Sequence, residues 1–207
     1  MQKNSQRKIL LTGFVPFGND TINPSWEVVK KLQGKKINYA RIIGMKLPVV
    51  FGKAGRLIIN AIEKYQPEWV ISLGQQTGGS IILLERVGLN IHLGKDESKI
   101  KPKNEFIIPD GPAAYFVKLP FKSILSKLRK NEIPVNISFN AGTHLCNEVL
   151  YTMLNYVSTH KLSIKVGFIH IPMLPEQIAG KNKAYPSMSL ETLVKGIKLI
   201  VESCLTK

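Results

Sequence analysis

Short apolar runs alternate along the chain with longer segments in which apolar residues recur at helical spacing. Near-continuous apolar runs are typical of strands buried on both faces of a sheet, and a 3.6-residue period is typical of helices with one buried face. The runs predict strands over 8–14, 40–47, 69–73, 135–139 and 166–171, with a strand-like stretch over 81–91. The helical periods predict helices over 24–32, 50–66, 121–130, 143–159 and 189–205.

The order of these elements predicts the fold class. Strands that alternate with helices favour an α/β/α sandwich, in which helices cover both faces of a largely parallel, twisted central sheet. The chain has 207 residues, a length that fits a single domain over 1–207. Ligands of such sheets bind beyond the carboxyl ends of the strands. We therefore expect the chemistry in the loops that follow Phe14, Leu73, Phe139 and Ile171.

Local signals mark two helix starts and one long loop. Asn23 is a predicted N-cap, with Pro24 at the first helical position. Gly142 predicts a tight turn, and Thr143 is then the predicted N-cap of the next helix. Residues 94–112 are polar and turn-rich, and an irregular stretch of this length is typical of a lid or rim beside a functional site.

The composition indicates the class of protein and its cellular compartment. Hydrophobic residues make up 44% and charged residues 21% of the chain, as in ordinary globular proteins. The two cysteines, Cys146 and Cys204, are too few for a secreted disulfide scaffold. No signal-peptide pattern is visible, and no apolar run approaches the roughly 20 residues of a membrane span. We expect a cytoplasmic protein with free thiols and no membrane partner.

The net charge of +15, from 29 Lys and Arg against 14 Asp and Glu, raises nucleic-acid binding as a hypothesis. The lysines are scattered, however, and Asp96 and Glu97 interrupt the densest basic stretch, over residues 95–103. No basic run is interleaved with aromatic residues. The pattern favours a solvated, lysine-rich surface, so no nucleic-acid partner is expected.

Cys146 is the first candidate for chemistry. It falls three residues after the predicted cap Thr143, in the first turn of a helix. A helix N-terminus carries about half a positive charge and unpaired backbone N–H groups, which favour a thiolate and can hold an oxyanion. Free cysteines are also commonly buried as small apolar side chains, and that interpretation suits Cys204.

His170 lies at the end of the 166–171 strand. If that strand lies beside the 135–139 strand, the imidazole reaches the start of the cysteine helix. It would then act as base to the thiol and as acid to the departing amine. The other three histidines lack this placement, and a histidine in an apolar strand is otherwise commonly a structural residue.

Glu85 interrupts the apolar run over 81–91, and a buried carboxylate needs a partner. One interpretation is a salt bridge with a nearby Arg or Lys, although the adjacent Arg86 points to the opposite face of a strand. The other is that Glu85 accepts a hydrogen bond from the second nitrogen of His170 and fixes its tautomer. The residues alone leave both interpretations open.

Five motifs occur in one order along the chain. They are LTGFVPFG at 11–18 with NPS at 23–25, GQ at 74–75 before ERV at 85–87, GPAAY at 111–115, AGTHLCN at 141–147, and GFIHIP at 167–172 with LPEQ at 174–177. On these motifs the chain resembles the pyroglutamyl peptidase I family, also called pyrrolidone carboxyl peptidases, nearly from end to end.

The resemblance implies a catalytic triad, with Cys146 as nucleophile, His170 as its base and Glu85 as the carboxylate. It implies removal of the N-terminal pyroglutamyl residue from peptides, which are then the expected partners, without a metal or cofactor. Members of the family are typically cytosolic and often tetrameric, so a homotetramer is expected.

Pyroglutamate is an uncharged five-membered lactam, and such a ring suits an apolar, aromatic pocket with a few hydrogen bonds. The resemblance places Phe14 and Phe17 in this pocket and Gln75 beside it. His144 stands where many members carry an aromatic pocket residue, and Leu145 completes the expected substrate-binding set.

Two departures from the family pattern suggest an alternative function as a second hypothesis. They are His144 and Lys95, which matches an arginine position linked to the oxyanion region. The alternative is a catalytically weak homologue that binds pyroglutamyl-like peptides without fast turnover.

Overall fold

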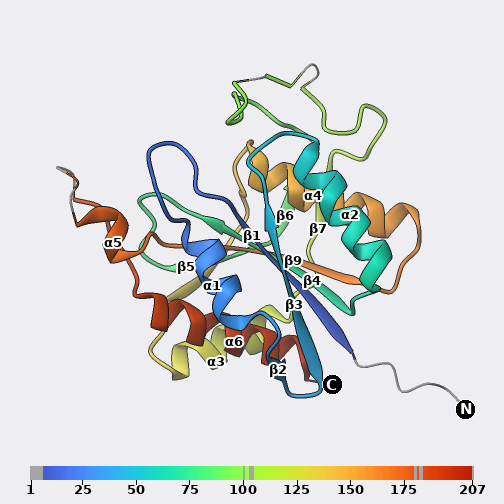
Figure 1. Ribbon diagram of the computed structural model, residues 1–207. Coiled ribbons are helices and arrows are strands. Elements are labelled where there is room, and N and C mark those ends of the chain that lie inside the picture. The colour runs from blue at the N-terminus through green and yellow to red at the C-terminus, as the bar shows by residue number, and fades with distance from the viewer. Residues whose placement is uncertain (1–6, 100, 103–104, 180, 182–183, 207) are drawn as a thin grey trace, which may run out of the picture.

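A seven-stranded sheet forms the centre of the computed structural model, which describes residues 7–99, 101–102, 105–179, 181 and 184–206 (Figure 1). The strand order is β2-β3-β1-β4-β9-β5-β8, and β6 pairs separately with β7. The strands are β1 (Lys8–Phe14), β2 (Lys36–Ile37), β3 (Ala40–Leu47), β4 (Trp69–Gln75), β5 (Ile82–Glu85), β6 (Val87–Leu89), β7 (Ala114–Phe116), β8 (Val135–Ser138) and β9 (Lys165–Ile171).

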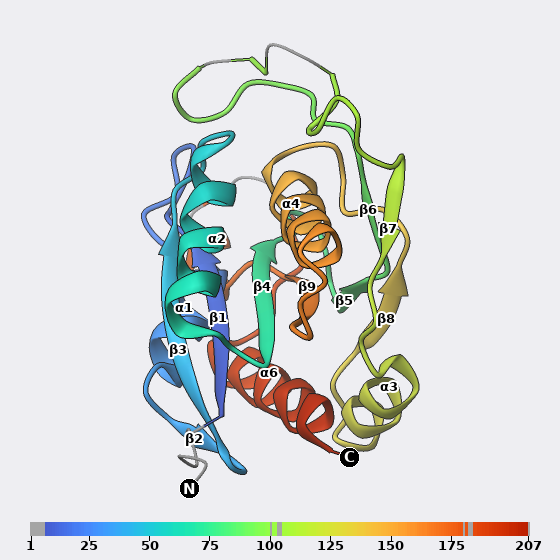
Figure 2. The ribbon, with the colours of Figure 1, turned by 90° about the vertical axis from the view of Figure 1, so that its right-hand side faces the viewer.

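Helices cover both faces of the sheet. On one face α2 (Lys53–Tyr65) packs on α4 (Leu145–Thr159). On the other, α1 (Pro24–Leu32) and α3 (Phe121–Lys130) pack on α6 (Leu190–Leu205). Figure 2 shows α3 and α6 below α2 and α4, with the sheet between the two groups. The predicted α/β/α sandwich is therefore confirmed, with the short helix α5 (Pro175–Ile178) added after β9.

The sheet is parallel through β3, β1, β4 and β9, whereas β5 and β8 run parallel to each other and antiparallel to β9. The condition considered for His170, that β9 lies beside β8, is not met, because β5 lies between them. Apart from Glu85, β5 is apolar and buries Ile82 and Leu84 completely, so it suits an interior position in the sheet.

The strand-like stretch over 81–91 is divided in two. β5 ends at Glu85, and Arg86 then takes the chain from the large sheet to the β6–β7 pair. The Arg86 N–H donates to Ser138 O over 2.7 Å, and the Arg86 carbonyl accepts from Val117 N–H over 2.9 Å. Arg86 therefore bonds to the last residue of β8 and to the residue directly after β7, at the point where the chain passes from one sheet to the other.

The starts of the first two helices follow local chemistry. Asn23 is the N-cap of α1 as predicted: its side chain accepts from Ser25 N–H over 3.0 Å, and Pro24 follows at the first helical position. α2 begins at Lys53, later than predicted, because Gly52 has a φ of 66° and lies outside the helical region.

The 94–112 stretch is irregular in its described residues and lies over the N-terminal end of α4 (Figures 1 and 2). Asn90 donates to Ile108 O over 2.7 Å, and the Tyr151 hydroxyl donates to Pro112 O over 2.7 Å. These bonds fix the far part of the loop to the body of the protein. Along the described ranges, no helix has both the length and the apolar character that a membrane span requires.

Candidate active site

Cys146 is the second residue of α4, which begins at Leu145 with His144 as its N-cap. The prediction of Thr143 as the N-cap is wrong. The Thr143 carbonyl accepts from Leu93 N–H over 2.6 Å, and the N-cap is the next residue, His144. Among the described residues, the backbone N–H groups of Leu145 and Cys146 have no hydrogen-bond partner. The start of the helix thus presents free donors beside the sulfur.

The Cys146 side chain packs against strands β4 and β9. A Cβ atom added to Gly74 would lie 3.0 Å from the Cys146 sulfur and 2.9 Å from the Phe168 ring. Gly74 is paired with His170 in the sheet register, so the sulfur lies over this pair of residues. The missing side chain at position 74 therefore gives the thiol its space, and Cys146 stays partly exposed.

His170 is 8% exposed, and its Nδ1 lies 2.7 Å from Glu85 Oε1. The contact follows from the register: Leu83 is the antiparallel partner of His170, and Glu85 lies two residues further on the same face. Burial lowers the pKa of His170, but the charges and hydrogen bonds of Cys146 and Glu85 outweigh it and raise the pKa to about 10. At neutral pH the ring is therefore an imidazolium.

Glu85 is fully buried, and its second oxygen, Oε2, has no hydrogen-bond partner within the described structure. Arg86 does not pair with it, because the Arg86 guanidinium carbon lies 4.6 Å from the centre of the Phe121 ring. Of the two interpretations of Glu85, the structure therefore agrees with the one in which its carboxylate pairs with His170. A carboxylate on Nδ1 leaves Nε2 for the thiol.

A second histidine–carboxylate pair includes Glu148, two residues after Cys146. His92 Nδ1 is 2.8 Å from Glu148 Oε2, and Glu148 Oε1 accepts from Gly52 N–H over 2.6 Å. The Phe51 ring contacts both His92 and His144 edge-on. Glu148 is 2% exposed, so this pair fastens the loop before α2 and the segment around His92 to the first turns of α4.

A cavity of about 280 Å³ opens beside the sulfur. All five predicted substrate-binding residues line it, together with Cys146 and His170. Four lining residues were not predicted as site residues: Asn23, Val49, Glu97 and Ala141.

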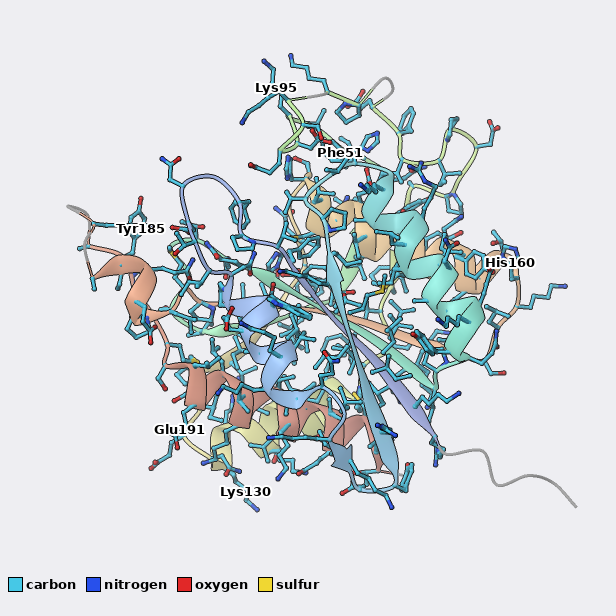
Figure 3. The ribbon with its side chains drawn as sticks, in the orientation of Figure 1. Phe51, Lys95, Lys130, His160, Tyr185 and Glu191 are labelled. Carbon is cyan, nitrogen blue, oxygen red and sulfur yellow. The ribbon has the colours of Figure 1, made fainter. Side chains whose placement is uncertain are left out.

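Lys95 does not line the cavity. Its carbonyl lies 3.0 Å from His144 Nε2, while its side chain is on the outer side of the loop above Phe51 (Figure 3). Lys95, whose position the resemblance linked to the oxyanion region, therefore contacts His144 through its backbone carbonyl.

This arrangement suits acyl transfer. A cysteine sulfur beside an imidazolium at a helix N-terminus is placed to act as a nucleophile, and the free N–H groups are donors for a developing oxyanion. The described residues contain no group of three or more His, Cys, Asp or Glu side chains that could hold a metal ion.

Comparison with known proteins agrees with this chemistry. The sequence model of the pyroglutamyl peptidase family, Peptidase_C15, matches residues 7–207. The chain belongs to the pyroglutamyl peptidase family. It is therefore a hydrolase of the cysteine peptidase class.

Relatives and solved structures match over nearly the whole chain. A pyrrolidone-carboxylate peptidase of Bacillus licheniformis is 44% identical over 195 residues, which is 93% of this chain and 90% of the relative. One from Treponema denticola is 44% identical over 95% and 92% of the two chains. The crystal structure of pyroglutamyl peptidase I from Bacillus amyloliquefaciens has a TM-score of 0.92 at 40% identity, over 97% of this chain and 96% of that one.

Two polar networks hold the walls of the cavity in this pyroglutamyl peptidase family member. At the first wall, Ser25 Oγ accepts from Phe14 N–H over 2.9 Å, and Asn23 donates to Val15 O over 3.0 Å. The cap of α1 is therefore also the support of the loop that carries Phe14 and Phe17.

At the second wall, Gln177 fixes the orientation of Gln75. Leu174 N–H donates to Gln177 Oε1 over 3.0 Å, so the Gln177 amide must turn its Nε2 the other way. That nitrogen donates to Gln75 Oε1 over 3.0 Å and to Asp20 Oδ2 over 2.9 Å. A buried glutamine thus ties the end of β4 to the loop after β1.

Asn147, next to the nucleophile, holds the α4 helix against β6. We expect Asn147→Ala to lower the free energy of unfolding by about 2–4 kcal/mol. Its side chain accepts from Leu89 N–H over 2.9 Å and donates to the carbonyls of Leu89 and Ile91 over 2.8 Å each. Alanine removes the partner of Leu89 N–H and of the Ile91 carbonyl beside a fully buried site, and leaves the Leu89 carbonyl with Ile91 N–H alone. Urea unfolding followed by circular dichroism measures the change.

Asn155→Ala is the matched control on the same helix. Asn155 accepts one bond, from the Tyr115 hydroxyl over 3.0 Å, and is only partly buried. We expect this variant to lose less than about 1 kcal/mol. Equal losses in the two variants would contradict a special role of Asn147 in placing the helix.

Proposed function

We propose that the protein removes the N-terminal pyroglutamyl residue from peptides through a Cys146–His170–Glu85 triad and a thioester intermediate. The observation that carries the proposal is the line of contacts from a helix-start thiol to an imidazolium to a buried carboxylate, beside a cavity of about 280 Å³. Family membership supports the reaction class.

In the first half of the reaction, the Cys146 thiolate attacks the carbonyl carbon of the pyroglutamyl residue. The oxyanion that forms is held by the free N–H groups at the start of α4. His170 gives its proton to the amine nitrogen, the C–N bond breaks, and the shortened peptide leaves as a thioester remains on the sulfur.

In the second half, neutral His170 takes a proton from water as the water oxygen attacks the thioester. The C–S bond then breaks, which releases pyroglutamate and restores the thiolate and the imidazolium. Glu85 holds Nδ1 throughout, so that Nε2 is the nitrogen that exchanges protons.

The lactam ring fits the apolar part of the cavity, which includes Phe14, Phe17 and Leu145. We therefore expect pyroglutamyl-aminomethylcoumarin to be cleaved at least about 10³-fold faster, in kcat/KM, than prolyl-aminomethylcoumarin. The prolyl ring lacks the lactam carbonyl and carries a charge, which is costly to bury without a partner. Fluorescence release from the purified wild type measures both substrates.

Equal cleavage of the two substrates would contradict the proposed specificity. Tight binding of pyroglutamate with no detectable release from either substrate would instead favour the catalytically weak homologue. The cytoplasmic location stays a prediction from the composition and the resemblance, and the homotetramer stays a prediction from the resemblance.

A further inference from the structure

One exposed carboxylate stands at the mouth of the catalytic cavity. Of the residues that line this cavity, Glu97 is the exposed one, and the others are buried or partly buried. Phe14 and Leu145 are only 3% and 2% exposed, so they belong to the inner end. Glu97 therefore marks the side on which a substrate enters and its leaving group departs.

The backbone at Glu97 is fixed on both sides. Its N–H donates to Val49 O over 3.1 Å, and Val49 itself lines the cavity. The preceding residue, Asp96, is 4% exposed, and its carboxylate accepts from Phe51 N–H over 3.0 Å and Ser98 N–H over 2.8 Å. The acidic side chain is thus attached to an anchored part of the loop, next to the cavity wall.

The charge of Glu97 is available to a ligand. No ion pair of Glu97 occurs within the part of the chain that the structure describes. The neighbouring Lys95 and Lys99 do not line the cavity, and Lys95 lies on the outer side of the loop (Figure 3). Although the chain has a net charge of +15, the exposed residue that lines this cavity is therefore acidic.

The proposed reaction fixes the direction in which a peptide lies. The uncharged ring occupies the inner end, the scissile carbonyl lies at Cys146, and the first residue of the leaving peptide emerges at the rim. Because the pyroglutamyl residue has no charge, the side chain of that next residue is the first group that can meet Glu97.

We propose that Glu97 makes the enzyme prefer peptides in which Lys or Arg follows the pyroglutamyl residue. The inference rests on the proposed function and adds a specificity on the leaving-group side. An ion pair at an exposed site has a modest effect, and we expect kcat/KM to be about two- to fivefold higher for lysine than for alanine at this position. High salt should remove most of the difference.

The test uses three peptides that differ only in the residue after pyroglutamate, which is Lys, Ala or Glu. Release of the shortened peptide is followed by chromatography at about 20 mM and 500 mM NaCl, below and above physiological screening. The readout is the ratio of kcat/KM values for Lys and Glu, which a general loss of folding or catalysis does not change. Glu97→Gln should bring this ratio close to one, and Glu97→Lys should invert it.

Glu105→Gln is the matched control, because Glu105 is an exposed carboxylate of the same loop that does not line the cavity. It should keep the wild-type ratio. A wild-type ratio near one, or a ratio that survives Glu97→Gln, would overturn the inference while the proposed function stands. If none of the three peptides releases pyroglutamate, the proposed function itself fails.

Discussion

Replacement of Cys146 by alanine is expected to lower kcat on pyroglutamyl-aminomethylcoumarin by at least about 10⁴-fold. The variant keeps the cavity and the free N–H groups of α4 but has no atom that can form the thioester. Because Cys146 is partly exposed and packs on Gly74 without crowding, the smaller side chain should leave the fold intact. Fluorescence release measures the loss, and circular dichroism checks the fold.

Cys204→Ala is the matched control, since it removes the second thiol. Burial raises the pKa of Cys204 to about 12, so this thiol stays protonated and unreactive at neutral pH. We expect the control to keep its kcat and iodoacetamide to label Cys146 alone in the folded wild type. Activity of Cys146→Ala close to that of the wild type would exclude the proposed mechanism.

The elements that could be predicted are those whose signal lies within a few residues. β1, β4 and β9 are buried on both faces and therefore appear as apolar runs. The start of α1 is equally local, because Asn23 caps a residue only two positions away. Each of these features depends on residues that are close together in the sequence, so composition and spacing are enough to predict them.

The strand order and the start of α4 depend on residues far apart in the sequence. Nothing in the apolar run of β5 indicates that it separates β9 from β8. Thr143 has the composition of an N-cap, but its carbonyl binds Leu93, fifty positions earlier in the chain, and the helix begins two residues later. Long-range bonds of this kind outweigh local propensity.

The same distinction explains which site residues were missed. Gln75, His144 and Leu145 lie in motifs with a visible signal, whereas Val49 and Glu97 come from segments far apart in the sequence that a backbone hydrogen bond joins at the cavity. Asn23 was predicted as a helix cap alone, although it also lines the cavity. A residue that already has a structural explanation in the sequence gives no second signal.

The pKa of His170 has consequences for stability as well as for catalysis. It is raised from the ordinary value of 6.5 to about 10, because the interactions with Cys146 and Glu85 outweigh burial. A raised pKa in the folded state means that these interactions stabilise the fold fully below pH 6.5. The contribution is lost as the pH rises from 6.5 towards 10.

For catalysis, we expect kcat/KM to fall on the alkaline side near pH 10 in the wild type, where His170 loses the proton that the leaving amine needs. In Glu85→Gln this limb should move down by about 1–3 pH units, because the carboxylate that supports the imidazolium is gone. At neutral pH, kcat should fall by about 10²–10⁴-fold. A pH profile of pyroglutamyl-aminomethylcoumarin cleavage measures both effects.

The loss is expected whichever way the new amide turns. If its oxygen faces His170, its NH₂ group takes the place of Oε2, a buried position where the carboxylate oxygen has no hydrogen-bond partner within the described structure. If its NH₂ faces His170, Nδ1 must accept a hydrogen bond, and the proton moves to Nε2, where the thiol needs a base.

Glu148→Gln makes the same chemical change in the second histidine–carboxylate pair, two residues from the nucleophile. Glu148 contacts His92 and Gly52, and neither residue lines the cavity. This control should lose stability, since Glu148 is 2% exposed, but its alkaline limb should stay near pH 10. If the alkaline limb shifted in Glu148→Gln and not in Glu85→Gln, the proton transfer would belong to His92, and the proposed role of His170 would be wrong. The two histidine–carboxylate distances are nearly equal, at 2.7 and 2.8 Å, but His170 also interacts with the thiol, and the pH profile reports that contact.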